Sequence, residues 1–435
     1  MIYYSTRDTD RKNPQTFANA VLQGLASDGG LFLPEKLPTL PNSFFEHIER
    51  ISNEDIALQI AVAFIGDEIP LDVLKQIVVE TINFDLPLFP VKENMFSLEL
   101  YHGPTMAFKD VGARFMARVM AYFVKQHLKQ EVKVVVATSG DTGSAVAAGF
   151  FGMEGIKVYI LYPKGKVSPL QEKQLNTWGG NIIALEVEGS FDDCQALAKQ
   201  LLNDEELKHT AYLSSANSIN IARLVPQSFY YAIAYKQLKQ YQKPIVFCVP
   251  SGNFGNLAAG FMLKLMGMPV ERFIAATNAN DVFPKFLSEG VYASAPSKVT
   301  LSNAMDVGAP SNFERLWQLC DQDVAVFRKY MQSISVSDAT TTNTLKTVYE
   351  TKNYLLDPHG AVGYYALDQY LNEHPDVIGA FLETAHPAKF VEVVEHILQE
   401  KINIPAKLMA FAAKEKVAFQ VPVDAEAVKR VLQEK

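Results

Sequence analysis

The sequence predicts an α/β protein with mainly parallel sheets and helices on both faces, arranged as two α/β domains that flank a cleft, plus an N-terminal cap domain. Two observations support this. From about residue 96 onward, short apolar runs alternate with amphipathic stretches, a pattern typical of buried parallel strands and covering helices. The 435 residues suffice for two or three domains. The predicted strands are Val132–Ala137, Ile156–Leu161, Ile182–Val187, Pro244–Val249, Phe273–Thr277 and Val377–Leu382.

Helices are predicted where apolar residues recur at helical spacing between these runs, as from Val111 to Phe123 and from Cys194 to Leu201. The first 95 residues lack the alternation and instead carry a proline-rich stretch followed by amphipathic helices near 53–64 and 70–82. The tail from about residue 400 returns to helix and strand. We expect a cap domain at 1–95, an α/β domain with a reactive lysine at 96–230, and an α/β domain with a phosphate-binding loop and the tail at 231–435.

Composition and charge narrow the function classes. The formal charge is −8 and no basic run interleaves with aromatic residues, so we expect no nucleic-acid partner. Three separated cysteines suit a reducing compartment and disfavour disulfides or a thiolate metal site, and the eight histidines form no ligand-spaced cluster. The N-terminus resembles neither a signal nor a transit peptide, and no apolar stretch reaches 18 residues. We expect a cytoplasmic protein with no metal and no membrane contact.

A glycine- and asparagine-rich loop follows the strand that ends at Val249 and precedes a helical run. Such a turn lets main-chain N–H groups converge at a helix N-terminus, which attracts a phosphate. The alternative is an ordinary tight turn, where Gly and Asn are common for backbone reasons, and the loop alone leaves both interpretations open. The candidate phosphate ligands are Ser251, Gly252, Asn253, Phe254, Gly255 and Asn256.

A second loop, Thr138–Gly143, lies between the strand Val132–Ala137 and a helix that starts near Ser144. Its hydroxyls and amides suit the carboxylate of an amino acid at a helix entrance. Ser, Asp and Thr are also ordinary helix starters, and for this loop taken alone a plain N-cap is the better explanation. The candidate carboxylate ligands are Thr138, Ser139, Gly140 and Thr142.

Lys109 lies among apolar and conformationally constrained residues in the segment His102–Asp110. Most lysines are solvated. If Lys109 is partly buried, its amine is neutral more often than the usual pKa of about 10.4 allows and can attack an aldehyde. Lys109 is therefore the candidate Schiff-base lysine.

Together the three loops resemble those of pyridoxal-phosphate enzymes with the tryptophan synthase β-like fold, and the whole chain resembles the threonine synthases of the long bacterial and fungal type. The resemblance includes two N-terminal segments, Tyr3–Arg7 and Gly24–Pro34. It implies pyridoxal 5′-phosphate as cofactor, covalently bound by Lys109, with its phosphate on the 251–256 loop. It also implies that Thr384 meets the pyridine nitrogen of the cofactor.

The segment Ser215–Arg223 resembles the part of this family that grips the phosphate of the substrate. Arginine suits this task because its planar fork binds two phosphate oxygens. The candidate ligands are Asn217, Ser218 and Arg223, with Lys166 as a further candidate that a solvated loop position explains as well. His359 and His386 are expected to line the cleft in uncharged packing or hydrogen-bonding roles.

Asp141 departs from the wider superfamily, in which dehydratase-type relatives usually have Asn where this sequence has Asp. Threonine synthases of this type share the Asp. If Asp141 approaches the phenolic oxygen of the cofactor, the two anions repel unless they share a proton. We therefore place Asp141 at the cofactor and leave its contact open.

By resemblance, the substrate is O-phospho-L-homoserine, which is converted with water to L-threonine and phosphate by γ-elimination and β-hydration in the last step of threonine biosynthesis. The alternatives are a phospholyase or hydroxyamino acid dehydratase that gives 2-oxobutyrate, and a non-catalytic pyridoxal-phosphate-binding relative. The Arg223 segment argues against the dehydratase. We expect a monomer or a homodimer.

Overall fold

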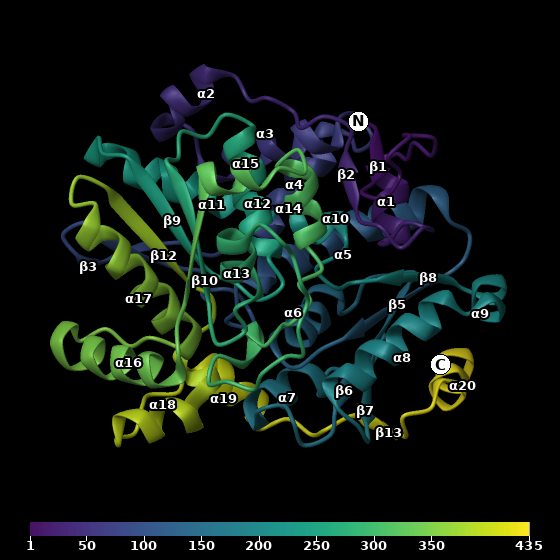
Figure 1. Cartoon of the computed structure of the whole chain (residues 1–435). Helices are drawn as coiled ribbons and strands as arrows, with labels where there is room; N and C mark the ends of the chain where they lie inside the picture. The colour runs from purple at the N-terminus through teal and green to yellow at the C-terminus, as the bar shows by residue number, and fades with distance from the viewer. Residues whose placement is uncertain (435) are drawn as a thin grey trace.

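The computed structural model describes residues 1–434, in which the strands form three sheets. Figure 1 shows two large sheet regions with helices around them and the N-terminal segment on one side. In that segment β1 (Tyr3–Ser5) pairs antiparallel with β2 (Phe32–Pro34). Its helices are α1 (Phe17–Gln23), α2 (Asn42–Glu46), α3 (Asn53–Ile65) and α4 (Leu71–Thr81), with a short 3-10 turn at Ile48–Arg50. The two predicted helices of the cap region thus correspond to α3 and α4.

The larger sheet has six strands in the order β11-β10-β9-β12-β4-β3, and all neighbours are parallel except the β3/β4 pair. Its strands are β3 (Leu88–Lys92), β4 (Met95–Glu99), β9 (Ile245–Pro250), β10 (Arg272–Thr277), β11 (Met331–Ser335) and β12 (Ile378–Glu383).

The second sheet has five strands, all parallel, in the order β13-β7-β6-β5-β8. Its strands are β5 (Val132–Ala137), β6 (Ile156–Pro163), β7 (Ile182–Val187), β8 (Tyr212–Ser215) and β13 (Ala418–Val421). The predicted α/β class with mainly parallel sheets is confirmed, and each of the six predicted strands lies within two residues of an observed one.

The two sheets exchange segments of the chain. β4 begins at Met95 and pairs with β12 in the larger sheet, whereas β13, near the C-terminus, pairs with β7 in the smaller one. The expected domain boundaries at 95 and 230 divide the chain into consecutive segments. The two sheets are not made of consecutive segments, so these boundaries do not separate the strands of one sheet from those of the other. The N-terminal half thus contributes β4 to the larger sheet, and the C-terminal end contributes β13 to the smaller one.

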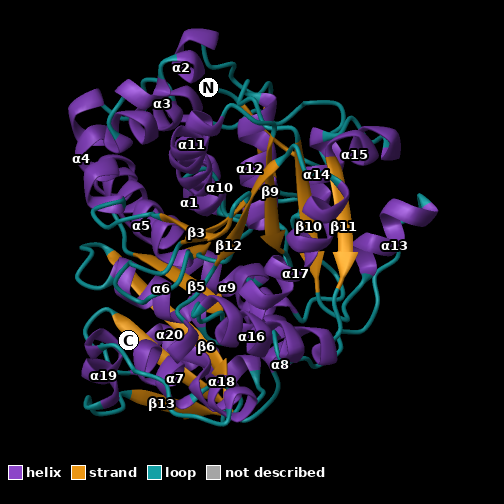
Figure 2. Ribbon diagram, turned by 90° about the vertical axis from the view of Figure 1, so that its left-hand side faces the viewer, coloured by secondary structure: helices purple, strands orange, loops and turns teal. Residues whose placement is uncertain are grey.

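Helices pack on both sides of the strands, as Figure 2 shows. Between β4 and β9 they are α5 (Lys109–His127), α6 (Asp141–Phe150), α7 (Pro169–Asn176), α8 (Phe191–Asn203), α9 (Glu205–Thr210), α10 (Ile221–Leu224) and α11 (Gln227–Leu238). Between β9 and β12 they are α12 (Gly255–Leu265), α13 (Val282–Glu289), α14 (Phe313–Leu319), α15 (Val324–Tyr330), α16 (Asp338–Lys352) and α17 (Pro358–Glu373). After β12 come α18 (Val391–Leu398), α19 (Ala406–Ala412) and α20 (Ala425–Glu434). Short 3-10 turns occupy Lys239–Tyr241, Asn303–Met305 and Pro387–Phe390.

The side chains of the central strands alternate between two apolar layers. In β9, Phe247 and Val249 join the main core, while Val246 and Cys248 pack into a separate cluster on the other face. A strand that is buried on both faces needs a continuous apolar run, which explains why the sequence pattern revealed these strands. The three cysteines are buried and unpaired, in line with a packing role. Within residues 1–434 no helix combines the length and apolar content that a membrane span requires.

Candidate active site

The predicted lysine loop is bound to the end of β12. Phe108 donates its N–H to the Thr384 carbonyl over 2.8 Å, and His386 donates its N–H to the Met106 carbonyl over 3.1 Å. Met106 has a φ of 58°, an unusual conformation for a non-glycine residue, and the turn leads directly into α5, whose first residue is Lys109. The fold therefore brings Lys109 and Thr384 together, although they are distant in the sequence.

Lys109 as a residue is half-buried, and no described residue gives its Nζ a hydrogen bond or an ion pair. Burial lowers the pKa of Lys109, the nearby positive charges of Arg223 and Lys389 lower it further, and Asp141 opposes them. A lysine without a partner and with a lowered pKa has the properties of an amine that reacts with an aldehyde.

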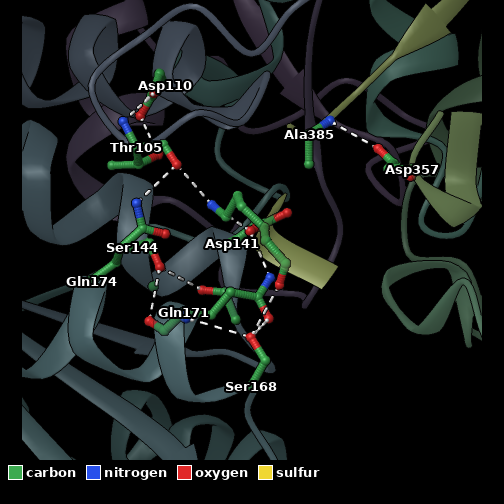
Figure 3. A network of polar contacts seen from close by, with 12 residues as sticks. Thr105, Asp110, Asp141, Ser144, Ser168, Gln171, Gln174, Asp357 and Ala385 are labelled. Atoms are coloured by element: carbon green, nitrogen blue, oxygen red, sulfur yellow. Dashed lines mark hydrogen bonds and ion pairs between the residues drawn. The ribbon is translucent and has the colours of Figure 1, made fainter. Parts of the chain in front are cut away.

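Asp141 is the buried anion of this group. Its Oδ1 forms an ion pair with Lys389 Nζ at 2.7 Å and accepts a hydrogen bond from Gln171 Nε2 at 2.8 Å. Burial alone raises the pKa of Asp141, but Lys389 and Lys109 lower it to about 2. Figure 3 shows Asp141 within a polar network that also contains Thr105, Gln171 and Ser168. Asp141 is therefore ionised at neutral pH.

Thr138 is used within its own loop. Its Oγ1 accepts from Gly140 N at 3.0 Å and from Gly143 N at 2.8 Å. Thr138 therefore has the helix-capping role that the sequence left open as the simpler explanation of this loop. Gly140 is required here, because a Cβ at its φ of 151° would lie 3.0 Å from the Gln171 side chain. Ser139 and Thr142 are half-buried, and their hydroxyls form no hydrogen bond with any described residue.

The predicted phosphate loop is a turn between β9 and α12. Phe254 has a φ of 57°, and α12 starts at Gly255. A Cβ on Gly252 would lie 2.7 Å from the Met305 Cα, so this position has no room for a side chain. Asn253 fixes the loop, because its Nδ2 donates to Ser218 Oγ at 2.9 Å and its Oδ1 accepts from Ser311 N at 2.5 Å.

Asn256 is the strongest sign that this turn binds an acceptor. Its Oδ1 accepts from the hydroxyls of Tyr230 at 2.8 Å and Tyr231 at 2.7 Å. Its Nδ2 is buried and has no hydrogen-bond partner. A buried donor without an acceptor is costly. The donor set of this turn therefore fits a phosphate, and together with Lys109 it fits pyridoxal phosphate.

Arg223 is a buried cation with few partners. One Nη donates to the Ala216 carbonyl at 2.5 Å, while Nε is buried and unbonded. Burial lowers the pKa of Arg223 to about 10, so the group stays charged at neutral pH. No carboxylate among residues 1–434 forms a salt bridge with it. Of its predicted companions, Ser218 contacts the phosphate loop and Asn217 donates from Nδ2 to the Ala137 carbonyl at 3.0 Å.

Lys166 stands apart from this group, because it lies on an exposed turn.

The two histidines are engaged in hydrogen bonds. His359 Nδ1 lies 2.8 Å from Asp357 Oδ1, and its Nε2 accepts from Ala304 N at 3.2 Å. Burial and the neighbouring His102 lower the pKa of His386 to about 4. Both positions match the expected hydrogen-bonding role.

Two residues of the site have no predicted role. Lys389 is buried against Asp141, and Arg315 is fully buried, with Nη2 donating to the Ile219 carbonyl at 2.5 Å beside the predicted substrate segment. The signal that selected Lys109, a lysine among apolar residues, also holds for Lys389 in Ala388–Phe390. Arg315 lies in an ordinary helix pattern and offers no comparable signal.

Three family models match the chain. A model described as pyridoxal-phosphate dependent enzyme matches residues 88–379, one described as threonine synthase N terminus matches residues 2–82, and one described as threonine synthase, C-terminal matches residues 360–432. The first covers more than half of the chain and includes the lysine loop, Asp141, Arg223 and the glycine turn. Thr384 and Lys389 lie beyond it, in the part matched by the C-terminal model.

Relatives and solved structures agree with these matches. The chain is 44% identical over 424 residues to a threonine synthase of Escherichia coli, with 97% of each chain covered, and 36% identical to that of Saccharomyces cerevisiae, with 100% of this chain and 98% of the relative covered. The crystal structure of the Escherichia coli threonine synthase superposes with a TM-score of 0.93 at 43% identity and covers 100% of both chains. A pyridoxal-phosphate-bound threonine synthase from Brucella melitensis gives a TM-score of 0.92 at 35% identity and covers 100% of this chain and 99% of that one. The fold, the cofactor loops and these full-length matches place the chain in the threonine synthase family of pyridoxal-phosphate-dependent enzymes.

Proposed function

We propose that the chain converts O-phospho-L-homoserine and water to L-threonine and inorganic phosphate, by γ-elimination and β-hydration. The observation that carries this proposal is Arg223. Its guanidinium is buried, lacks a carboxylate partner, keeps an unbonded Nε, and lies within electrostatic reach of Lys109. A second anion site beside the cofactor lysine suits a substrate that is both an amino acid and a phosphate ester.

Four parts of the chain would hold the cofactor. Lys109 would bind its aldehyde, the Ser251–Asn256 turn its phosphate and Thr384 its pyridine nitrogen, while Asp141 would face its phenolic oxygen. Pyridoxal phosphate, when bound, supplies an electron sink for negative charge on the carbons of the amino acid. Because Thr384 offers a neutral hydroxyl and not a carboxylate, this site does not favour a protonated pyridine nitrogen.

Lys109 is the proposed base and acid. Its pKa is lowered by burial and by the two neighbouring cations, so its free amine can accept the proton from Cα of the substrate. Once the amine has passed that proton on and is neutral again, it can accept the proton from Cβ. No other described amine lies in this cluster without a hydrogen bond, since Lys389 is bound to Asp141 and to the Thr105 carbonyl. The same nitrogen would return protons in the later steps.

The remaining ligands orient the substrate. Ser139 and Thr142, with the N-terminus of α6, would bind its carboxylate, while Thr138 and Gly140 shape that loop. Arg223 would bind the phosphate as it leaves Cγ, where negative charge develops, and Asn217 and Ser218 would add neutral donors. Because Lys166 lies on an exposed turn, we propose for it only an outer contact with the phosphate of the substrate.

The product separates this function from its alternatives. Purified protein loaded with cofactor is incubated with O-phospho-L-homoserine, and the organic product is identified by NMR. We expect threonine and an equal amount of phosphate. Abundant 2-oxobutyrate without threonine would instead make the chain a phospholyase, and no turnover with intact cofactor binding would make it a non-catalytic relative.

We also propose a cytoplasmic location and a monomeric or homodimeric state. The acidic, cysteine-poor composition supports the first. Light scattering on the purified protein measures the second, and a mass of three or more chains would contradict it.

A further inference from the structure

The buried lysine that the mechanism leaves unused is Lys389. Its side chain is fully enclosed, and its Nζ makes an ion pair of 2.7 Å with Asp141 and donates to the Thr105 carbonyl over 2.8 Å. The two partners belong to different parts of the site, since Asp141 starts α6 and Thr105 lies in the lysine loop. One ammonium therefore joins the start of α6 to the lysine loop.

The Thr105 end of this link is itself rigid. Thr105 donates from its N–H and its hydroxyl to the carboxylate of buried Asp110, at 2.8 and 2.6 Å. Its carbonyl also accepts from Gln174 Nε2 at 3.0 Å. Lys389 is thus held at a fixed place, and the bonds around Thr105 appear in Figure 3.

The Asp141 end of this link affects the protonation of Lys109. Both of its bonds are made by Oδ1, so one carboxylate faces Lys389 directly while it also acts on Lys109 from a distance. An unpaired buried carboxylate would hold a nearby amine in its protonated form. A carboxylate that is paired with a second ammonium does so much less.

We propose that Lys389 is a positioning residue that keeps Lys109 chemically available: it neutralises Asp141 and ties it to the lysine loop. This inference rests on the proposed role of Lys109 as the cofactor lysine. Imine formation requires a neutral amine, whose lone pair forms the C–N bond while both of its N–H protons leave with the aldehyde oxygen as water.

Three charged groups act on this equilibrium from the elements around Lys109. Asp141 on α6 favours the protonated amine, while Arg223 on α10 and Lys389 after β12 favour the neutral one. Lys389 in turn acts on Asp110 at the start of α5 and on His386. His386 is uncharged above about pH 4, so the balance at neutral pH is set by the two cations against Asp141.

The test follows the return of pyridoxal phosphate to the full chain after the cofactor has been removed. The rate of imine formation is recorded by absorbance between pH 6 and 10, and its pH midpoint reports the fraction of neutral amine. We expect Lys389→Met to move this midpoint upward by about one unit or more, and to slow imine formation about tenfold near pH 7.5. Lys389→Arg keeps the charge and should restore most of the rate.

Three further variants make the test specific. Asp141→Asn should move the midpoint downward, and the double variant Asp141→Asn/Lys389→Met should return it toward that of the unmodified chain. Lys429 is a matched control, because it too is buried and ion-paired, with Asp204 and Glu206, far from the site on α20. Lys429→Met should leave the midpoint unchanged.

Borohydride reduction and peptide mapping separate the two possible failures. If Lys109 carries the cofactor while Lys389→Met and Asp141→Asn leave the midpoint where it was, the positioning role is wrong and the proposed function stands. If the label lies on Lys389 or on no lysine, both are overturned. Should Lys389→Met fail to fold by circular dichroism, Asp141→Asn alone decides, because an unmoved midpoint in that variant contradicts the inference.

Discussion

Asn253 donates from Nδ2 to Ser218 Oγ over 2.9 Å. This bond joins the turn proposed to hold the cofactor phosphate to the segment proposed to hold the substrate phosphate. Asn312 adds to it, since its Nδ2 donates to the Asn253 carbonyl at 3.1 Å and lies 3.5 Å from the same hydroxyl. The two proposed anion sites would therefore share a wall, and a change in that wall should affect both.

Ser218→Ala tests the shared wall. The change removes the acceptor of Asn253 and a donor for the substrate, each worth about 1 kcal/mol for a neutral hydrogen bond. We expect the cofactor affinity to fall by about fivefold and KM for O-phospho-L-homoserine to rise by a similar factor. Cofactor fluorescence and steady-state kinetics measure the two effects, and a change in only one of them would mean that the sites are independent.

Arg223→Ala should separate the two sites. Arg223 makes no bond to the 251–256 turn, so we expect cofactor absorbance and affinity to stay as they are. Loss of a charge-assisted contact to the leaving phosphate should lower kcat/KM by about 100-fold or more. Arg223→Lys keeps the charge without the planar fork and should recover only part of the loss. An equal loss of cofactor in either variant would contradict this assignment.

The strands missing from the sequence prediction are mostly the edges of the two sheets. β3, β11 and β8 each lie at an edge, and their burial is incomplete, so they lack the apolar run of a central strand. β4 is the internal exception. It is buried, but its Ser97 and Glu99 lie within hydrogen-bond distance of the Tyr354 hydroxyl. These polar residues interrupt the apolar run and hide the strand.

For the site, local loops could be predicted and their tertiary partners could not. The glycine turn and the lysine loop each carry a signal within a few consecutive residues, so candidate residues could be named there from the sequence alone. Lys389 acquires its role only through Asp141 and Thr105, which the fold brings from elsewhere in the chain. The same holds for Thr138, whose hydroxyl accepts hydrogen bonds within its own loop.

Gly252→Ala should damage the cofactor turn through sterics alone. A Cβ at this position would lie 2.7 Å from the Met305 Cα and 3.1 Å from the Ala304 carbonyl oxygen, both backbone atoms that cannot rotate away. We expect a lower midpoint of urea unfolding for the cofactor-free chain, corresponding to about 1–3 kcal/mol of overpacking. Gly255→Ala is the comparison, because its nearest atom would be an amide nitrogen at 3.4 Å. Equal midpoints for the two variants would show that the turn has room.

His386 should make the chain sensitive to mild acid. Burial lowers its pKa to about 4 in the folded chain, against an unfolded value near 6.5. Between these values the unfolded chain binds a proton that the folded chain does not, so stability falls as the pH decreases from about 6.5 to 4. The loss from this residue between pH 7 and 5 should reach about 2 kcal/mol.

His386→Asn isolates this effect. His386 Nδ1 accepts from Ala388 N at 3.1 Å, and an Asn side-chain oxygen can replace that acceptor without titrating. Urea unfolding at pH 7 and pH 5 should therefore show a smaller acid-induced drop in the variant than in the unmodified chain. His47→Asn, on an exposed surface position, should leave the drop unchanged. If both variants lose as much stability with acid as the unmodified chain does, other groups cause the loss. His386 would then bind the same number of protons in the folded and the unfolded chain.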